Sequence, residues 1–346
     1  MILIDFSALL HQNVYGAISG MKPEKDENGK YITEQFISYT KYLIIQEILE
    51  FKKRFKEYGN VTLCLDCHSS ANWRLDVYKP YKGSRHAGRE QSPINWGEVY
   101  TEINALEDAF RNLTSLNVVM IEHAEGDDVI LCLAEFCARK HEKTMIISAD
   151  KDLIQAQKYP EISQYSPITR KFVTPEDKDN SMQDWHNDHV YLGDASDEVP
   201  SVFKNLVFTD KFAEYIKAKN LNITPDMFDE RPELIEQVSE KFGANIFKAL
   251  KVGPATLKKL IARDDEILKN PLLLKRLKRN EKLVLMEYIP ESIKNECKIA
   301  FNSLNEPKSY KRKEFETYLT ENHCENLIVQ CNELETGEID TSFFDF

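Results

Sequence analysis

Acidic side chains follow four short apolar runs of the chain, each at once or within a few residues. The runs cover residues 2–4, 61–65, 118–121 and 144–147, and the acidic residues after them are Asp5, Asp66, Glu125, Asp127, Asp128, Asp150 and Asp152. A single aspartate in such a place often only caps a helix or begins a turn. Four coincidences favour a shared site, because the carboxyl ends of parallel strands meet at one edge of a sheet.

A carboxylate cluster of this kind requires a cation. Carboxylates within a few ångströms of one another raise each other's pKa unless a positive charge neutralises them. Because the donors are carboxylate oxygens, Mg²⁺ is favoured over zinc, and Mn²⁺ is an acceptable substitute. Two such ions, roughly 4 Å apart, activate a water and stabilise the leaving oxygen when a phosphodiester is hydrolysed. Phosphodiester hydrolysis with two metal ions is therefore the expected chemistry.

The elements that must position these residues can be read from the pattern of apolar side chains. The four apolar runs predict buried strands, and helical spacing of apolar residues predicts helices over 33–58 and 127–139. Strand and helix in alternation predict an α/β fold with a mainly parallel central sheet flanked by helices. Beyond about residue 200 the pattern is helical with proline interruptions, which predicts a second, helical lobe.

Composition excludes several classes of protein. The chain has 346 residues, of which 42% are hydrophobic and 29% charged, a balance that fits a folded globular protein of two lobes. No apolar run reaches the roughly 20 residues of a membrane span, and the first residues do not resemble a signal peptide, so we expect a cytoplasmic protein without membrane contact. A net charge of −12 argues against indiscriminate coating of nucleic acid.

Two basic segments nevertheless stand out in this acidic chain. Residues 241–282 hold twelve Lys and Arg against four Asp and Glu, and residues 73–90 hold five against two. Either segment alone could be a solvated helix face. The first basic segment along the chain mixes its cations with aromatic residues, a combination that suits single-stranded nucleic acid.

Five blocks of residues resemble the 5′-nuclease or flap-endonuclease superfamily, and within it most closely the ribonucleases H of T-even bacteriophages. The blocks are Leu3-Ile4-Asp5-Phe6-Ser7, then Asp66 with Trp73-Arg74-x-Asp76 and Tyr81-Lys82-x-x-Arg85, then Glu125-Gly126-Asp127-Asp128, Ser148-Ala149-Asp150-Lys151-Asp152, and Gly193-Asp194-x-x-Asp197. They occur in the order of the family over about 200 residues. The resemblance implies a PIN-like 5′-nuclease fold, with a nuclease domain over 1–200, an arch at about 70–100 and a helical DNA-binding lobe over 201–338.

The resemblance also implies roles for individual residues. It assigns Asp5, Asp66, Glu125, Asp127, Asp150 and Asp152, with Asp128 as a further candidate, mainly to the tighter metal position, and Asp194 and Asp197 to a second one. Glu198 departs from the asparagine that is usual in the family. Lys82 and Arg85 are expected to contact the scissile phosphate, and with Asp127 they are the expected catalytic residues. The expected nucleic-acid contacts of the arch are Trp73, Arg74, Lys79, Tyr81, Lys82, Arg85 and Arg89.

In the second lobe, residues 251–261 look like the family's helix-hairpin type of DNA-binding element. Gly253 permits a tight turn before a helix whose free amides bind phosphate, and Thr256, Lys258 and Lys259 are the further expected contacts. The stretch 201–245 looks longer than in the family and has no assigned role.

The last residues, 339–346, form an acidic segment that contains Phe343, Phe344 and Phe346. Aromatic side chains outside a core suggest a docking peptide, and this one resembles the clamp-binding tails of phage replicative polymerases. Packing of the segment onto the body of the protein is the alternative.

The motifs Cys64-x-x-Cys67-His68 and His186-x-x-His189 are interpreted as incidental. The first overlaps a buried strand end, and the second, which lacks a further ligand pair, is interpreted as part of a surface helix rather than a metal site.

The resulting hypothesis is a monomeric, structure-specific 5′-3′ exonuclease and flap endonuclease with ribonuclease H activity. It would act on RNA–DNA hybrid and on 5′-flap or forked duplex DNA, and would remove RNA primers during phage lagging-strand replication in the host cytoplasm. A sliding clamp and a single-stranded-DNA-binding protein are possible partners. A catalytically silent replisome scaffold and a PIN-type ribonuclease are the alternatives; complete carboxylates argue against the first, and residues 73–90 and 251–261 against the second.

Overall fold

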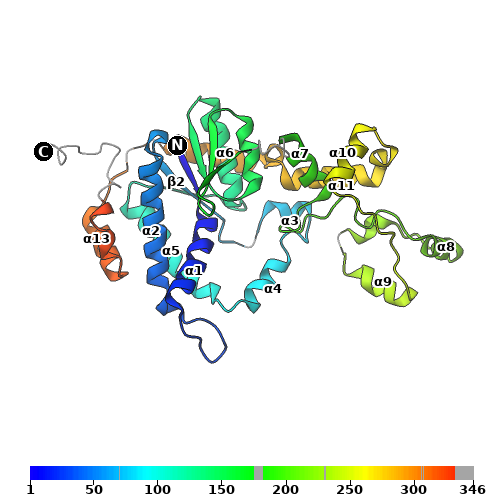
Figure 1. The fold of residues 1–346 in the computed structure, drawn as a ribbon, viewed down its shortest axis with the longest axis horizontal. Helices are drawn as coiled ribbons and strands as arrows, with labels where there is room; N and C mark the ends of the chain where they lie inside the picture. The colour runs from blue at the N-terminus through cyan, green and yellow to red at the C-terminus, as the bar shows by residue number, and fades with distance from the viewer. Residues whose placement is uncertain (70, 175–181, 230, 305, 307, 332–346) are drawn as a thin grey trace. The chain divides into compact units, whose positions relative to one another are not determined.

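The computed structural model describes residues 1–69, 71–174, 182–229, 231–304, 306 and 308–331, and the chain divides into two compact units (Figure 1). The first unit comprises Met1–Asn72, His86–Pro175 and, so far as they are described, the residues of Pro290–Phe346. The second comprises Trp73–Arg85 and Glu176–Ile289. This division differs from a boundary at residue 200. Residues 73–85 of the expected arch, called the arch base below, belong to the second unit, and the chain returns to the first unit after residue 289. The three functional domains expected from the sequence remain a prediction, and residues 339–346 lie outside the described residues.

A six-stranded sheet forms the centre of the first unit. The strand order is β3-β2-β1-β4-β5-β6, in which all neighbours are parallel except β5 and β6. β1, β2 and β4 are fully buried apolar runs, the pattern expected of strands covered on both faces. The strands are β1 (Ile2–Asp5), β2 (Val61–Leu65), β3 (Asn117–Met120), β4 (Thr144–Ile147), β5 (Ile162–Ser166) and β6 (Lys171–Val173).

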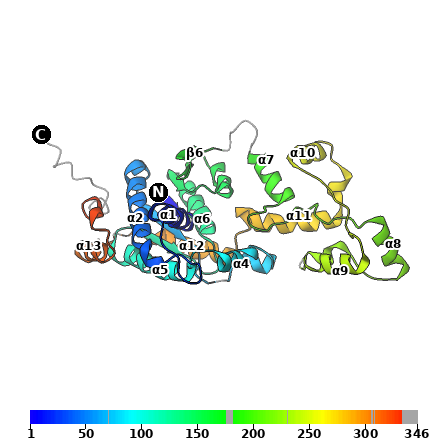
Figure 2. The same ribbon diagram turned by 60° about the horizontal axis from the view of Figure 1, so that its bottom comes forward.

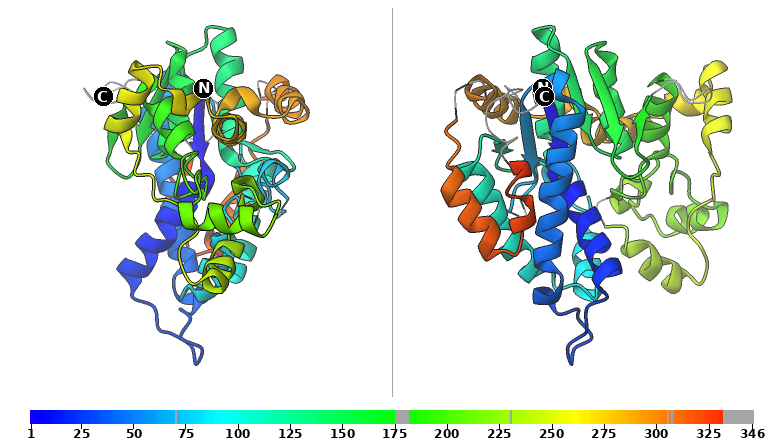
Figure 3. Two further views of the ribbon diagram at one scale, coloured as in Figure 1. Left: turned by 90° about the vertical axis from the view of Figure 1, so that its right-hand side faces the viewer. Right: turned by 60° about the vertical axis from the view of Figure 1, so that its left-hand side comes forward.

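Helices cover both faces of this sheet. Ile2, Ile4 and Leu63 point into a core with apolar residues of α1, α2 and α5, and Figure 3 shows α1 and α2 side by side. α6 packs on β1 to β4, and α12 packs on α6. The helices are α1 (Phe6–Met21), α2 (Ile37–Arg54), α5 (Trp96–Leu113), α6 (Gly126–Arg139), α12 (Glu291–Ser303) and α13 (Arg312–Glu321), with 3₁₀ helices η1 (Thr33–Gln35), η2 (Lys56–Tyr58), η3 (Lys151–Lys158) and η8 (Glu325–Leu327).

The second unit is helical (Figure 2). Within the stretch 201–245, which had no assigned role, apolar residues from Phe208 onward build a small aromatic core around Phe212 and Phe228, together with Ile246 and Phe247. The helices are α3 (Trp73–Val77), α7 (Met182–Asn187), α8 (Asp210–Ala218), α9 (Leu234–Phe242), α10 (Pro254–Ala262) and α11 (Pro271–Val284), with 3₁₀ helices η5 (Pro225–Phe228), η6 (Glu266–Lys269) and η7 (Met286–Tyr288) and the π-helical turn η4 (Asp188–Leu192). α4 (Ser84–Gln91) contains the point where the chain passes from the second unit to the first.

A buried arginine of α11, Arg276, joins this helix to the segment 202–229 of the second unit. Arg276 is only 3% exposed, and its guanidinium donates to both carboxylate oxygens of Asp229, at 3.0 and 2.6 Å. It also donates to the carbonyl oxygens of Val202 and Lys204. Four acceptors therefore compensate the burial of this charge.

The expected α/β class is confirmed, and the four expected strands are present. β3 begins and ends one residue earlier than expected, and β5 and the antiparallel edge strand β6 were not predicted. Within the described part of the chain, no helix combines the length and the hydropathy that crossing a bilayer needs.

Candidate metal centre

The strand order brings acidic residues to one edge of the first unit's sheet. β1 lies between β2 and β4, and all three run parallel, so their carboxyl ends are neighbours. Asp5 ends β1, Asp66 follows β2, and Asp150 comes three residues after β4. The sheet order reverses around β1, which is where open α/β sheets bind ligands.

Asp5 is the buried member of this group, with 7% of its surface exposed. Its Oδ1 accepts a hydrogen bond from the amide of Ala8 (2.9 Å), and its Oδ2 accepts one from the hydroxyl of Ser148 (2.8 Å). Burial raises the pKa of Asp5 to about 6; the two hydrogen bonds oppose this rise, and the negative charges of Asp66 and Asp150 add to it. The three carboxylates thus lie close enough to repel one another, as a metal centre would require.

A glycine allows Asp66 to approach the beginning of α6. The amide of Gly126 donates to Oδ1 of Asp66 at 2.7 Å. A Cβ at this glycine would lie 3.2 Å from the carbonyl oxygen of Cys64 and 3.3 Å from the same Oδ1. The beginning of α6 therefore fixes the orientation of the Asp66 carboxylate.

The three acidic residues at the beginning of α6 differ in their surroundings. Asp128 is fully buried, and its Oδ2 accepts from the amide of Glu125 (3.0 Å) as part of a capping box. This contact gives Asp128 a structural task, and its metal role remains a prediction. Glu125 and Asp127 are half-buried. The pKa of the Cys64 thiol is raised well above its ordinary value, first by burial and then by Asp5 and Asp127, which places Asp127 near the ends of β1 and β2.

After β4 the chain turns tightly through Asp150 and Asp152. The amide of Asp150 donates to the hydroxyl of Ser148 (3.0 Å), and the amide of Asp152 donates to Oδ1 of Asp150 (2.8 Å), which caps η3. Asp150 is exposed and Asp152 is half-buried. Ser148 therefore links the turn after β4 to the buried carboxylate of Asp5.

In the second unit, Asp194 and Asp197 lie on a closed loop. The backbone groups of Asp194 and Val199 exchange two hydrogen bonds, at 2.9 and 2.8 Å. Gly193 precedes the loop with a φ of 77°, and a Cβ there would lie 2.2 Å from the carbonyl oxygen of Val199. Only glycine fits this position. Oδ1 of Asp194 accepts from both the amide and the hydroxyl of Ser196, at 2.7 and 2.6 Å.

The carboxylate of Asp197 forms hydrogen bonds and ion pairs with side chains of the arch base. Its Oδ1 accepts from Arg85 (2.7 Å), and its Oδ2 accepts from the hydroxyl of Tyr81 (2.9 Å) and lies 3.3 Å from Nζ of Lys82. The carbonyl oxygen of Asp197 also accepts from the backbone amide of Lys82. The two expected catalytic cations are therefore held by a residue that was expected to bind metal.

Glu198, the departure from the family pattern, also contacts the arch base. Its Oε2 accepts a 2.7 Å hydrogen bond from the amide of Ser84, the first residue of α4. A carboxylate at a helix N-terminus is stabilised by the free amides there. Glu198 adopts a left-handed φ of 57°, which is unfavourable for a side chain of this kind.

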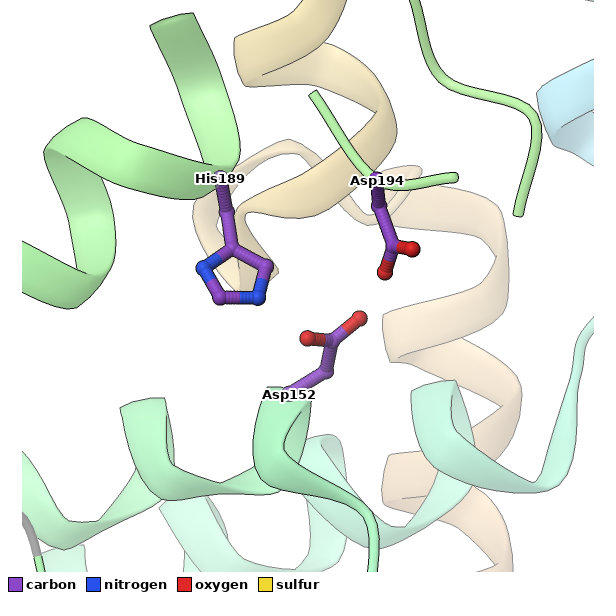
Figure 4. A group of neighbouring side chains, drawn as sticks. All are labelled: Asp152, His189 and Asp194. Atoms are coloured by element: carbon purple, nitrogen blue, oxygen red, sulfur yellow. The ribbon is translucent and has the colours of Figure 1, made fainter. Parts of the chain in front are cut away.

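His189 is a residue near Asp194 that the sequence interpretation dismissed. Figure 4 shows His189 and Asp194 of the second unit, with Asp152 at the beginning of η3 in the first. The nearest ligand atoms of His189 and Asp194 lie within 4.8 Å of one another. The spacing of His186 and His189 drew attention to a histidine pair, whereas the structure gives His189 an acidic neighbour, Asp194, five residues later.

The expected nucleic-acid contacts of the arch divide by exposure. Lys79, Arg85 and Arg89 are exposed, and Lys82 is half-buried. Trp73, Arg74 and Tyr81 are buried, and their contact with nucleic acid remains a prediction. The guanidinium of Arg74 stacks on the rings of Trp73 and Tyr81 and donates from Nε to the carbonyl oxygen of Leu283, so these three residues pack the core of the second unit.

The helix expected at residues 251–261 is present as α10. Gly253 is its N-cap and Pro254 its first residue, as the sequence predicts. Gly253, Thr256, Lys258 and Lys259 are exposed, and Lys258 lies 3.2 Å from Asp184. These groups are available at the surface, and their contact with DNA remains a prediction.

The sequence has relatives among characterised proteins. Residues 1–185 match the family described as 5′-3′ exonuclease, N-terminal resolvase-like domain. Ribonuclease H of Enterobacteria phage T4 is 31% identical over 168 residues, which are 48% of this chain and 54% of that protein. A 5′-3′ exonuclease of Buchnera aphidicola subsp. Schizaphis graminum is 25% identical over 209 residues, 59% of this chain and 66% of that protein. The chain thus spans about half to two thirds of the length of these relatives.

Solved structures show the same fold. The T5 D15 protein co-crystallised with metal ions matches with a TM-score of 0.53 and 14% identity, over 88% of this chain and 99% of that one. The T5 5′-exonuclease with bound divalent zinc matches with a TM-score of 0.53 and 16% identity, over 89% and 98%.

Proposed function

The chain belongs to the family of 5′-3′ exonucleases with a resolvase-like N-terminal domain, and from this premise we propose that it is a metal-dependent 5′ nuclease. The observation that carries the proposal is the buried carboxylate of Asp5, whose pKa is raised by burial and then by the charges of Asp66 and Asp150. Repulsion between carboxylates at a sheet edge is unfavourable, and a bound cation removes it.

The donor set suits hard divalent cations. In the first unit the groups that would hold the metal are the carboxylates of Asp5, Asp66, Asp127, Asp150 and Asp152, with Glu125 beside them. All are oxygen donors, which favour Mg²⁺ and accept Mn²⁺. When bound, a pair of such ions supplies an activated water and stabilises the leaving oxygen of a phosphodiester. The residues themselves orient the ligand oxygens, since Gly126 fixes Asp66 and Ser148 fixes Asp5.

Lys82 and Arg85 of the second unit would bind the phosphate of the substrate. Lys82 and Arg85 carry the charge that a scissile phosphate needs, and the loop at Asp197 holds both of them before substrate arrives. Preorganised charge avoids the cost of ordering two long side chains during the reaction.

For the substrate we propose RNA–DNA hybrids and 5′-flap or forked duplex DNA, processed by 5′-3′ exonuclease and flap endonuclease cleavage with ribonuclease H activity. This rests on relatives that bear the names ribonuclease H, 5′-3′ exonuclease and flap endonuclease. The free amides at the beginning of α10, with Lys258 and Lys259, would hold the duplex. We further propose that the protein acts as a monomer in primer removal during phage replication in the host cytoplasm, with a sliding clamp at residues 339–346 and a single-stranded-DNA-binding protein as partners.

The proposal is tested by cleavage of 5′-labelled RNA-primed and 5′-flap duplexes in Mg²⁺. We compare the intact protein with Asp127→Asn and, as a matched control, Asp108→Asn, whose carboxylate is exposed on α5. We expect cleavage from the 5′ end by the intact protein and the control, and a loss of at least about 100-fold in Asp127→Asn. Equal rates in all three proteins would overturn the proposed mechanism, and a protein inactive on every substrate would favour a silent scaffold.

A further inference from the structure

A small cavity of the second unit is lined by more positive than negative charge. Its volume is about 40 Å³, and its charged lining residues are Lys204, Asp229, Arg276 and Arg279. A space needs roughly 10–15 Å³ to hold one water, so this cavity has room for a few waters or for one phosphate group, but not for a nucleobase. Among the described residues, three cations around one carboxylate leave an excess of positive charge at the cavity.

The carboxylate of Asp229 is already used by one of the two arginines. Both of its oxygens accept from Arg276, at 3.0 and 2.6 Å. Nη1 of Arg279 lies 3.7 Å from Oδ2 of Asp229, which is too far for a hydrogen bond. The pKa of Arg279 is lowered, first by burial and then by the charge of Arg276, while Asp229 opposes this change. The charge of Arg279 is therefore only partly balanced.

The guanidinium of Arg279 is held in place by neutral groups. Its Nε and Nη2 donate to Oδ1 of Asn280, at 3.0 and 2.9 Å, and it lies over the ring of Tyr78, 4.9 Å from the ring centre. The amide nitrogen of Asn280 donates to the carbonyl oxygens of Val190 and Pro200, which fixes the acceptor oxygen in its place. One amide oxygen cannot satisfy the five N–H groups of a guanidinium. Within the described part of the chain, Nη1 forms no hydrogen bond and can donate to a ligand.

Two further donors of the cavity lining have no hydrogen-bond partner among the described residues. Tyr78 is buried, yet its hydroxyl forms no hydrogen bond there, and the ammonium of the exposed Lys204 forms no ion pair. A buried polar group without a partner is unfavourable. The oxygens of a phosphate would supply the acceptors that these O–H and N–H groups lack, through charge-assisted hydrogen bonds.

Three segments that are distant in the sequence meet at this cavity. Tyr78 directly follows α3, Lys204 lies in the stretch between η4 and α8, and Arg279 lies on α11, which packs on α3. All lining residues belong to the second unit, so the cavity is complete within it.

We propose that this cavity binds a phosphate group through Nη1 of Arg279, the hydroxyl of Tyr78 and the ammonium of Lys204. A backbone phosphate of a nucleic acid and the free phosphate of a small molecule share this chemistry. The first source rests on the proposed function, and the second does not. None of the three residues belongs to the proposed metal centre or to the cations proposed for the scissile phosphate.

The test is phosphate binding to the full chain in EDTA, which prevents metal-dependent cleavage. The small probes are inorganic phosphate and thymidine 5′-monophosphate, measured by titration calorimetry with thymidine as the unphosphorylated control. The large probe is a fluorescent DNA duplex, measured by anisotropy at several salt concentrations. We expect binding of both small phosphates but not of thymidine, or a salt slope of duplex binding that falls by about 1 in Arg279→Gln. Absence of both effects overturns the proposal.

Three variants identify the residues. Arg279→Gln should weaken binding of the phosphate by roughly tenfold or more, because it removes hydrogen bonds between charged groups. Tyr78→Phe keeps the ring beside Arg279 and removes only the hydroxyl, so it should cost several-fold in affinity even if Arg279→Gln fails to fold. The matched control Lys278→Gln, exposed on the same helix, should bind like the unmodified protein. Full binding in Tyr78→Phe and Arg279→Gln, or an equal loss in Lys278→Gln, contradicts the proposed site.

The pattern of losses identifies the source of the phosphate. Loss of the small phosphates in Arg279→Gln, with unchanged duplex affinity and salt slope, assigns the cavity to a free phosphate. A lower salt slope assigns it to the nucleic-acid backbone. Phosphate binding in a protein that cleaves no substrate keeps the site and refutes the nuclease. Cleavage in Mg²⁺ by a protein that shows neither binding effect refutes only the phosphate site.

Discussion

Replacing Asp5 by asparagine should stabilise the metal-free protein while abolishing its activity. The carboxylate is 7% exposed, and burial is the largest cause of the rise of its pKa from 3.8 to about 6. Above pH 6 the ionised group therefore costs the folded state roughly 3 kcal/mol relative to the unfolded chain. Asparagine removes this charge and keeps an oxygen that accepts from the amide of Ala8.

One contact reduces the expected gain. The hydroxyl of Ser148 donates to Oδ2 of Asp5 at 2.8 Å, and an asparagine that presents its amide nitrogen there offers no acceptor. This loss costs about 1 kcal/mol, so the net stabilisation is about 2 kcal/mol at pH 7.5. For a chain of this size, that corresponds to a rise in Tm of roughly 3 °C.

The sign of the pH dependence follows from the direction of the shift in pKa. Because the pKa of Asp5 is higher in the folded protein, the folded state binds more protons between pH 3.8 and 6. The stability of the metal-free wild type therefore falls as pH rises through this window, and its deficit against Asp5→Asn is complete above pH 6. Added Mg²⁺ should reverse the order, since binding to the folded state stabilises only the protein that keeps the site.

The assay is thermal unfolding of both proteins at pH 5.0 and 7.5, in EDTA and in Mg²⁺, with Asp108→Asn as an exposed control. The reasoning is refuted if Asp5→Asn melts at or below the wild-type temperature in EDTA at pH 7.5. A difference that is no smaller at pH 5.0 would show that burial of the charge is not its cause.

Three further substitutions test contacts of the two units. Gly126→Ala places a Cβ 3.3 Å from Oδ1 of Asp66. It should weaken Mn²⁺ binding several-fold, measured by titration calorimetry, and lower the free energy of unfolding by about 1 to 2 kcal/mol. An unchanged Mn²⁺ affinity would contradict the role of Gly126 in orienting Asp66. Glu198→Asn suits the positive φ at this position but shortens the side chain that accepts from the amide of Ser84. The amides of Ser84 and its neighbours in α4 should then exchange hydrogen roughly five times faster, measured by mass spectrometry. Equal exchange in the two proteins would show that Glu198 does not stabilise the beginning of α4. Arg276→Met removes the two hydrogen bonds from Arg276 to Asp229 and leaves that carboxylate only the more distant Arg279, at 3.7 Å. We expect the second unit to lose about 3 kcal/mol of stability in urea unfolding, and a loss under 1 kcal/mol would rule out this pairing as its main support.

The sheet of the first unit was predictable because its strands are short, apolar and fully buried. Residues 61–65 and 144–147 form strands with the expected bounds. β6 was not predictable in the same way, since its three residues are mostly exposed and its pairing with β5 is antiparallel. An edge strand of this kind lacks the apolar pattern that identifies a buried one.

The proximity of Asp5, Asp66 and Asp150 at one edge of the sheet was predictable, but the hydrogen bonds of the individual carboxylates were not. Strand ends identify Asp5 and Asp66, because the alternation of strands and helices determines which ends meet. The same pattern cannot show that Asp128 turns inward to cap α6, or that Asp197 faces two cations from a segment more than a hundred residues earlier. These assignments depend on tertiary contacts, which leave no periodic signal in the sequence.

The return of the chain from the second unit to the first affects how the protein can fold during synthesis. α12 packs on α6, and the thiols of Cys132 and Cys297 contact each other between these helices. All segments of the second unit, up to Ile289, leave the ribosome before α12 does. The apolar surface beside α6 therefore stays partly exposed until about 300 residues have left the ribosome. A chain that stops earlier would have the acidic residues at the sheet edge but lack the packing of α12 on α6.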